Sequence, residues 1–199
     1  MSEIEQSVEQ VLVLPRTALD SVCPAQFNKN LIVARPVIEA ACFFKQRNTV
    51  EKDFSLKQII PYVVIQCGDK FLSIQRTTKQ TESRLHNKYS VGVGGHINNT
   101  DVTTDGVIET GMRRELNEEI QIPGEISCEL IGIINDDSTE VARVHTGFVF
   151  LLKTASLDFQ VMEIDHHQAQ WRTVSELVAL GEQLESWSQL VLENVIKAS

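Results

Sequence analysis

The sequence lacks long apolar runs and closely spaced cysteines. No apolar stretch approaches the ~18 residues that a membrane-spanning helix requires, so we expect neither a transmembrane segment nor a membrane partner. The acidic N-terminal residues 1–6 lack the basic and apolar regions of a signal peptide. The cysteines form no CxxC pair, which disfavours a zinc site or a disulfide framework: they are Cys23, Cys42, Cys67 and Cys128. We therefore expect a cytoplasmic protein with reduced thiols.

Basic residues are also few. The chain has 18 Lys and Arg against 27 Asp and Glu, and its formal net charge is −9. Affinity for a nucleic acid polymer depends on clustered Lys and Arg, so we expect no such partner. An acidic chain can still act on a small anionic substrate when a metal ion screens the repulsion.

The pattern of apolar residues predicts one α/β domain. At 199 residues, of which 42% are hydrophobic, the chain is long enough to bury a core. Glycines interrupt a predicted strand at 90–97, and glycine inside a strand marks a bulge or a close approach to a ligand. Segment 38–44 fits a helix or a buried strand. The pattern also predicts strands at 11–15, 59–66, 71–76, 129–134 and 144–152, a helix from near Gly106, a last segment beginning at Trp171, and helices at 174–180 and 184–196.

Three carboxylates are crowded on the predicted central helix. Glu115, Glu118 and Glu119 have the i, i+3, i+4 spacing that places side chains on one side of a helix. Like charges so spaced repel by roughly 0.2–0.5 kcal/mol per pair. A few carboxylates together with substrate phosphates are the ligands that Mg²⁺ takes in proteins, so the segment predicts a metal site. A solvated acidic face is the alternative.

The residues around these glutamates resemble the Nudix box of the Nudix hydrolases. Gly94-Gly95-His96-Ile97 precedes Arg114-Glu115-Leu116-Asn117-Glu118-Glu119. The family's box reads Gly, five residues, Glu, seven residues, then Arg-Glu-aliphatic-any-Glu-Glu-any-Gly-aliphatic. The resemblance covers roughly residues 59–196 and implies an α/β/α sandwich with a mixed central sheet, a box helix and C-terminal helices. Residues 59–199 would form the Nudix domain, and residues 1–58 an N-terminal extension packed on the same domain.

The chain departs from the box at two points. Gly95 and Arg114 are nineteen positions apart where the family has fourteen, so five residues are inserted in the loop 98–105. Counting back from Arg114 places Gly106 where the first Glu belongs; that carboxylate is absent, or Asp101 or Asp105 replaces it. Gln121 replaces the final Gly.

The resemblance also implies roles for the box residues. The ligands of Mg²⁺ or Mn²⁺ would be Glu115, Glu118, Glu119 and the Gly94 carbonyl oxygen, and Arg114 would fix a glutamate in place. Glu118 is the first candidate for the catalytic base. Gly111, one turn before Glu115, would leave room for metal and phosphate; a weak helix position is the alternative. Further candidates for the base come from a following loop: Asp136, Asp137 and Glu140.

Five more residues are candidates for substrate binding. Arg76 and Arg84 precede the Gly-Gly turn and could bind phosphates, or belong to a solvated basic loop. Gly95 and His96 lie in the turn, and His145 lies in the strand after the box helix. A strand-end turn and structural histidines are the alternatives.

The predicted activity is metal-dependent hydrolysis of a diphosphate bond in a nucleoside-diphosphate-linked or similar small organic substrate. A Nudix-fold ligand-binding or sensor module is the alternative, motivated by the missing glutamate and by the extension. Isomerisation of isopentenyl diphosphate on the same fold is disfavoured, because those enzymes look to have a cysteine in the strand before the box and this chain has Ser90-Val91-Gly92-Val93. Dimers are common in the family, so a homodimer is an open expectation.

Overall fold

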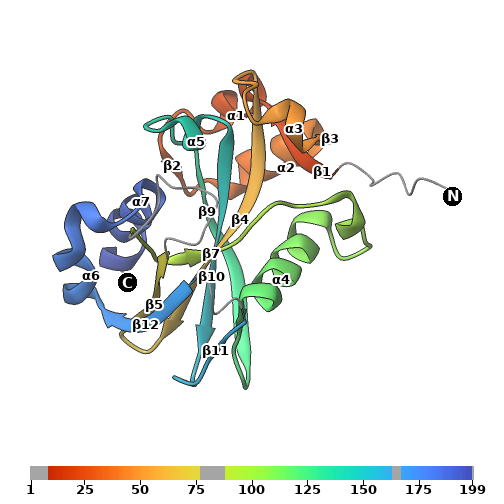
Figure 1. Cartoon of the computed structure of the whole chain (residues 1–199). Coiled ribbons are helices and arrows are strands. Elements are labelled where there is room, and N and C mark those ends of the chain that lie inside the picture. The colour runs from red at the N-terminus through yellow and green to blue at the C-terminus, as the bar shows by residue number, and fades with distance from the viewer. Residues whose placement is uncertain (1–8, 77–87, 163–166, 199) are drawn as a thin grey trace, which may run out of the picture.

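A mixed ten-stranded sheet organises the part of the chain that the computed structural model describes, residues 9–76, 88–162 and 167–198 (Figure 1). The strands are β1 (Gln10–Pro15), β2 (Phe27–Asn28), β3 (Phe43–Gln46), β4 (Leu56–Cys67), β5 (Lys70–Arg76), β6 (Tyr89–Ser90), β7 (Gly92–Val93), β8 (Ile120–Gln121), β9 (Ile126–Ile134), β10 (His145–Thr154), β11 (Gln160–Val161) and β12 (His167–Thr173). The helices are α1 (Arg16–Val22), α2 (Leu31–Ala41), α3 (Arg47–Val50), α4 (Val107–Glu119), α5 (Glu140–Arg143), α6 (Val174–Leu180) and α7 (Ser186–Asn194), with short 3₁₀ turns at Asn99–Asp101, Gly181–Gln183 and Ile196–Ala198.

The sheet contains both kinds of strand pairing. Its main order is β12-β5-β4-β10-β9-β2, while β1 pairs with β3 and β4, β6 with β5, and β7 with β4. β4 and β10 run parallel over ten paired positions, from His145 opposite Gln58 to Thr154 opposite Cys67. The neighbouring pairs β4–β5 and β10–β9 are antiparallel. β8 and β11 form a separate two-stranded sheet.

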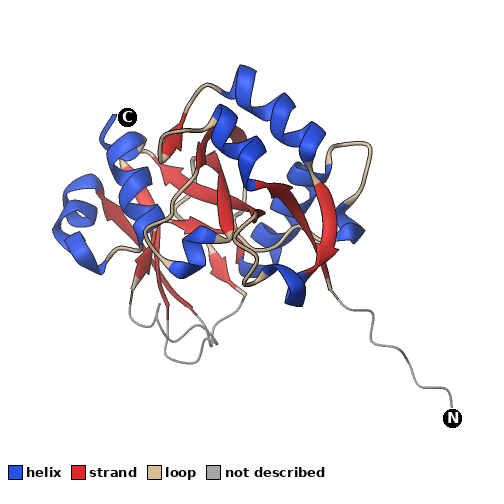
Figure 2. Ribbon diagram, turned by 90° about the horizontal axis from the view of Figure 1, so that it is seen from above, coloured by secondary structure: helices blue, strands red, loops and turns tan. Residues whose placement is uncertain are grey.

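Alternation along the central strands creates two cores. In β10, Phe148, Phe150 and Leu152 pack in one core with residues of α1, α2 and α4, whereas Val149 and Leu151 pack in the other with residues of α6 and α7. A period of two is what a strand buried on both faces requires. Helices therefore cover both sides of the sheet (Figure 2), and the predicted α/β/α sandwich is confirmed.

Most predicted elements are present. The segment left open at 38–44 contains both alternatives, because α2 ends at Ala41 and β3 begins at Phe43. The prediction for Trp171 is wrong: it lies inside β12, opposite Leu72 of β5. Its indole Nε1–H donates to the Leu157 carbonyl oxygen at 2.7 Å, so a distant loop, which the local sequence pattern does not reveal, determines its position.

The N-terminal extension joins the same sheet. β1 pairs with β4 from Val13 to Pro15, and the Leu12 N–H donates to the Ile97 carbonyl oxygen at 2.9 Å. β4 itself starts at Leu56, so it spans both sides of the proposed division between residues 1–58 and 59–199, which stays a prediction. The extension therefore bonds directly to the segment that follows the Gly-Gly turn.

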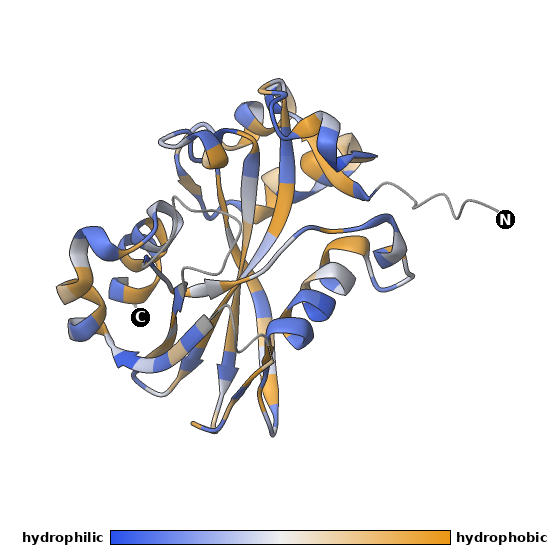
Figure 3. Ribbon diagram, viewed as in Figure 1, coloured by the Kyte–Doolittle hydropathy of each residue, from blue (hydrophilic) through white to orange (hydrophobic). Residues whose placement is uncertain are grey.

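The helices are short. Within the described ranges, none is both long enough and apolar enough to cross a membrane. Figure 3 shows that α4 becomes hydrophilic toward its C-terminal end, where the box carboxylates lie.

A buried lysine holds the segment between β9 and β10. The Lys57 side chain is fully buried, and its Nζ donates to the carbonyl oxygens of Asp136 (2.9 Å) and Ala142 (3.0 Å) and to Asp137 Oδ1 (2.9 Å). Burial lowers the pKa of Lys57, and the neighbouring Asp137 partly counters the effect. A charged group is tolerated here because three acceptors replace its water shell.

We predict that Lys57→Met lowers the free energy of unfolding by about 2–3 kcal/mol, because two buried carbonyl oxygens lose their donor. Urea denaturation measures the change. The control is Lys153→Met at an exposed position of β10, which should stay within about 0.5 kcal/mol of the parent protein. Equal stabilities for the two variants would contradict the structural role of Lys57.

Candidate active site

The turn after β7 requires glycine at Gly94, and the next residue, Gly95, lies against the end of the Glu115 side chain. A Cβ atom on Gly94 would collide with the Pro61 carbonyl oxygen in β4, and one on Gly95 would collide with the Glu115 carboxylate. The backbone of the turn therefore lies against the central sheet at one residue and against α4 at the next. This close approach positions the Glu115 carboxylate beside the Gly-Gly turn.

Helix α4 presents its charged residues because its apolar stripe is buried. Ile108, Met112 and Leu116 lie in the core, and the chain turns extended at Ile120. Gly106 precedes the helix with a φ of 96°, a conformation that favours glycine. The remaining faces carry Arg114 and the three glutamates.

The Arg114 guanidinium uses all five of its N–H donors. Nε and Nη2 bond the two Asp101 carboxylate oxygens, each at 2.9 Å, and Nη2 also bonds the His96 carbonyl oxygen at 2.8 Å. Nη1 bonds Glu115 Oε1 at 2.8 Å and Glu118 Oε2 at 3.1 Å. The bonds to Asp101 are the main cause of a raised pKa at Arg114. A rigid fork with five acceptors fixes the Gly-Gly turn and the helix relative to each other.

Asp101 occupies the position of the missing carboxylate. Its residue is only 2% exposed, and its Oδ2 also accepts from the Asn98 N–H at 2.8 Å. Burial alone would raise the pKa of Asp101, but the bonds from Arg114 and Asn98 reverse this and lower it. Counted forward from Gly95, Asp101 is the sixth residue, where the box expects its first Glu. The backward count to Gly106 missed this, because the inserted residues follow Asp101.

Gly111 has a different role from the one predicted. A Cβ atom there would lie 3.0 Å from both Asp101 Oδ2 and Ile97 Cγ1. The space that glycine leaves is thus filled by the Asp101 carboxylate and an apolar side chain, and not kept open for metal and phosphate. The prediction failed because the loop 98–101 folds back onto α4, which the local pattern does not show.

The side chain of Glu115 is less exposed than that of Glu118. Its side chain is 15% exposed, against 55% for Glu118. Burial raises the pKa of Glu115, Arg114 lowers it, and the negative charges of Glu118 and Glu119 raise it further, for a net increase. A bound cation would relieve this destabilised anion, so the oxygen ligands fit a hard divalent metal. In the described part of the chain, however, no three His, Cys, Asp or Glu side chains already converge on one point, so the ligand set stays a prediction.

Two histidines meet beside the turn. The His145 Nδ1–H donates to the Val141 carbonyl oxygen at 2.7 Å, and His145 Nε2 lies 3.3 Å from Nε2 of His96. Burial lowers the pKa of His96 to about 3 and also lowers that of His145. Both rings are therefore neutral at pH 7, and a hydrogen bond joins them.

A cleft of about 1150 Å³ opens beside this pair. Its floor includes Gly94, Gly95 and His96, with His145 next to them. The extension also contributes lining residues, and so does the segment that leads into α7: they are Arg47, Glu51, Lys52 and Phe54, and Leu184, Glu185, Ser186, Trp187 and Gln189. Gly95 therefore lies between the two: it lines the cleft, and the Glu115 carboxylate lies against it.

The remaining predicted residues have varied positions. Asp137 pairs with Arg16 and Lys57, and Asp136 is buried and accepts from Ser138, so both carboxylates have structural partners. Glu140 lines the cleft. Arg84 lies outside the described residues, and for Arg76 only the backbone, which ends β5, is described.

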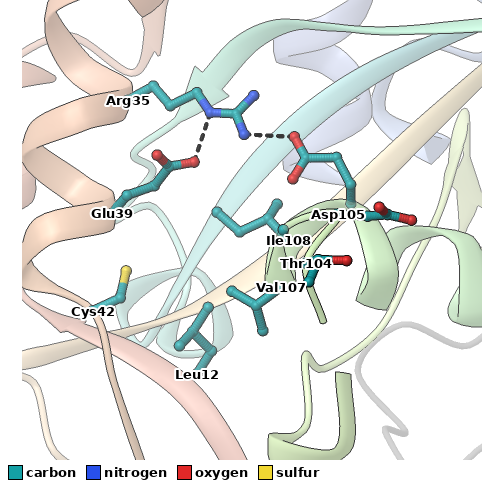
Figure 4. A pocket seen from close by; sticks show the side chains of 10 residues that line it. Leu12, Arg35, Glu39, Cys42, Thr104, Asp105, Val107 and Ile108 are labelled. Atoms are coloured by element: carbon teal, nitrogen blue, oxygen red, sulfur yellow. Dashed lines mark hydrogen bonds and ion pairs between the residues drawn. The ribbon is translucent and has the colours of Figure 1, made fainter. Parts of the chain in front are cut away.

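A second cavity, of about 400 Å³, separates α2 from the start of α4 (Figure 4). Arg35 of the extension bonds Glu39 and Glu109 there, each at 2.6 Å. Asp105 lines this cavity, whereas the carboxylate that Arg114 bonds in the loop 98–105 is that of Asp101. The ion pair to Glu109 connects the extension to the box helix.

Comparisons with known proteins were made for the whole sequence and the whole structure. No protein-family model matches the sequence. Protein YmaB of Bacillus subtilis is 38% identical over 163 residues, which are 78% of this chain and 79% of the relative. The crystal structure of Tm1382, which carries the description "a putative Nudix hydrolase", superposes with a TM-score of 0.82 and 31% identity, over 96% of this chain and 100% of the other.

A more distant match shows the fold alone. The Nudix domain of Shewanella oneidensis NrtR, solved in complex with ADP ribose, has a TM-score of 0.54 and 14% identity over 71% of this chain and 88% of that domain.

Two matched substitutions distinguish Asp101 from Asp105. We predict that Asp101→Asn lowers the free energy of unfolding by about 2–3 kcal/mol at pH 7, because Arg114 loses a charged, buried, bidentate partner. Asp105→Asn, at an exposed position, should change it by less than about 0.5 kcal/mol. Urea denaturation of both variants measures the difference, and equal effects would show that Asp101 is not the partner that matters.

The stability that Asp101 contributes should depend on pH. The pKa of Asp101 is lower in the folded chain than its ordinary 3.8, so its contribution is complete above that value and is lost as the pH falls through the folded pKa. We predict that the stability gap between the parent protein and Asp101→Asn is constant from pH 7 to pH 5 and narrows below about pH 4. A gap that widens on acidification would contradict the assignment. Unfolding curves at stepped pH provide the measurement.

Proposed function

Because the chain belongs to the Nudix hydrolase family, we propose that this hydrolase cleaves the diphosphate bond of a nucleoside-diphosphate-linked or similar small organic substrate. The single observation that carries the proposal is the position of Glu115. Its half-buried carboxylate lies against Gly95, and Gly95 also lines the large cleft. A cation held by that carboxylate would meet a phosphate that enters from the cleft.

The proposed cofactor is Mg²⁺ or Mn²⁺. Its ligands would be Glu115, Glu118, Glu119 and the Gly94 carbonyl oxygen. When bound, such a cation supplies polarisation of the phosphoryl oxygens and a lower pKa for an attacking water. Arg114 orients Glu115 and Glu118 through Nη1, while Nη2 of the same guanidinium bonds Asp101.

Glu118 is the proposed catalytic base. Its side chain is 55% exposed, so it can reach a solvent molecule, whereas the carboxylates of Asp136 and Asp137 have other partners. Glu140 at the cleft is the alternative from the following loop. The role of Arg114 is to hold Glu118 by one hydrogen bond while leaving its second oxygen for the reaction.

Substrate contacts are proposed for the floor of the cleft. Gly95 offers backbone groups to a phosphate, and His96 and His145 can offer hydrogen bonds. Both imidazoles are neutral, so they would act as hydrogen-bonding groups and not as cations. Arg76 and Arg84 stay proposed phosphate-binding residues, as charge-assisted donors.

The sensor alternative rests on the missing box carboxylate and on the extension. Asp101 provides an acidic partner for Arg114, which weakens the first of these two reasons. The complex with ADP ribose was solved for a distant Nudix domain. It makes ADP ribose a reasonable first probe for this chain. The absence of a nucleic acid polymer partner, a cytoplasmic location and a homodimer stay predictions.

We predict that Glu119→Gln lowers kcat about 100-fold or more with ADP ribose or another diphosphate substrate, because a metal ligand loses its charge. Phosphate release after a phosphatase step, with Mg²⁺ or Mn²⁺ present, measures the rate. Glu129→Gln, at an exposed position of β9, is the matched control and should keep the parent rate. Chelation of divalent ions by EDTA should abolish the parent activity.

Intact metal binding without turnover across a broad panel of diphosphates would reject hydrolysis. Ligand-induced thermal stabilisation with no product would then favour the sensor alternative.

A further inference from the structure

A buried serine connects α7 to the segment that leads into the Gly-Gly turn. Ser188 is fully buried, and its Oγ accepts from the Val91 N–H at 3.1 Å. The same Oγ lies 2.8 Å from the hydroxyl oxygen of Tyr62 in β4. Val91 stands between β6 and β7, three residues before Gly94. One hydroxyl group therefore bonds both the central sheet and the segment before the turn.

The Tyr62 hydroxyl extends this connection to Ser90. Its oxygen lies 2.9 Å from Ser90 Oγ, and Ser90 Oγ donates to the Gly92 carbonyl oxygen at 2.8 Å. A hydroxyl has one hydrogen, so Tyr62 must donate to Ser90, and Ser188 must donate to Tyr62. The three buried hydroxyl groups therefore form one chain that ends on Gly92, and the removal of any member leaves a buried partner unsatisfied.

The Tyr62 ring also contacts the backbone before the turn. A Cβ atom on Gly92 would collide with this ring, so the ring lies directly against β7. Trp187 of α7 packs edge to face on Tyr62, with the ring centroids 5.7 Å apart. The preceding residue, Pro61, meets Gly94 through its carbonyl oxygen. Two neighbouring residues of β4 therefore contact the two glycines that lead into and begin the turn.

The turn is held from both faces of the sheet. Residues of α4 pack in one core and residues of α7 in the other (Figure 1). Arg114 of α4 donates to the His96 carbonyl oxygen after the turn. Ser188 of α7 and Tyr62 hold the segment before the turn. The position of the Gly94 carbonyl oxygen, between these two attachments, therefore depends on both.

We propose that Ser188 is a positioning residue for the metal site: through Tyr62 and Val91 it holds the Gly-Gly turn so that the Gly94 carbonyl oxygen can join the metal ligands. This inference rests on the proposed function, because it takes that oxygen as a ligand. Ser188 is fully buried, so it would touch neither the metal ion nor the substrate. Its effect is therefore expected on metal affinity and on the mobility of the turn.

The test combines the binding of Mn²⁺ alone, by titration calorimetry, with hydrogen–deuterium exchange of residues 92–97 in the full chain. Ser188→Ala removes the donor to Tyr62 and the acceptor of the Val91 N–H. It should raise the Mn²⁺ dissociation constant about fivefold and speed exchange in 92–97. Tyr62→Phe keeps the ring but removes the hydroxyl link, so it should act in the same direction. Because both changes break one link, the double variant should bind Mn²⁺ about as weakly as Ser188→Ala.

Ser73→Ala is the matched control. Ser73 is also buried, and its Oγ donates to the Gln170 carbonyl oxygen at 3.1 Å and accepts from Arg172 Nε at 2.9 Å. These bonds connect β5 to β12 and not to the segment before the turn. Ser73→Ala should therefore lower thermal stability to a similar extent, yet leave both the Mn²⁺ dissociation constant and the exchange of residues 92–97 unchanged.

Several results would overturn the inference. They are unchanged Mn²⁺ binding in Ser188→Ala, with or without faster exchange, an equal effect of Ser73→Ala, and additive effects of Ser188→Ala and Tyr62→Phe. Thermal unfolding of each variant identifies a general loss of folding, and if Ser188→Ala does not fold, Tyr62→Phe decides. If the parent chain binds no Mn²⁺, the proposed function fails, and exchange in 92–97 alone decides whether Ser188 holds the turn.

Discussion

The site depends on one guanidinium group. Arg114 donates to Asp101, to the His96 carbonyl oxygen, and to Glu115 and Glu118. These acceptors belong to the loop 98–105, the Gly-Gly turn and the box helix, so one side chain connects the three segments. The planar fork imposes both distance and direction, so a lysine could not make the same set of contacts. Arg114 Nη1 donates to both Glu115 and Glu118, which offsets part of the repulsion between their carboxylates.

The extension is part of the same construction. The Leu12 N–H donates to the Ile97 carbonyl oxygen just after the turn, and Arg35 pairs with Glu109 of the box helix. Arg16 and Lys57 bond the loop before β10. Each contact connects segments far apart in sequence. Loss of the extension would therefore affect the position of the Gly-Gly turn and of the cleft, in addition to removing one edge of the sheet.

Local pattern predicted much of the fold, because α4 and the central strands have strong periodicities of burial that do not depend on distant partners. The Gly-Gly turn and Arg114 were predicted as site residues from the resemblance of their motif to the Nudix box. The sequence does not distinguish Asp101 from Asp105, because the five inserted residues can lie before or after either one. In the folded loop, Asp101 is the residue that bonds Arg114. The roles of Gly111, Trp171 and Asp137 depend on contacts with remote segments, which a single sequence does not reveal. His96 and His145 could be chosen as candidates, but their pairing and neutral state follow from burial where the segment after β7 meets the start of β10.

Arg114 and its hydrogen-bond partners are expected to present the box glutamates as a divalent-metal site beside the Gly-Gly turn. The anomalous scattering of Mn²⁺ in a crystal of the intact chain tests this directly. We expect a Mn²⁺ peak in contact with Glu115 and with Glu118 or Glu119, next to the Gly94 carbonyl oxygen, while Arg114 keeps its bonds to Asp101. A crystal containing Mn²⁺ in which the ion binds elsewhere, with no peak beside Glu115, would contradict it.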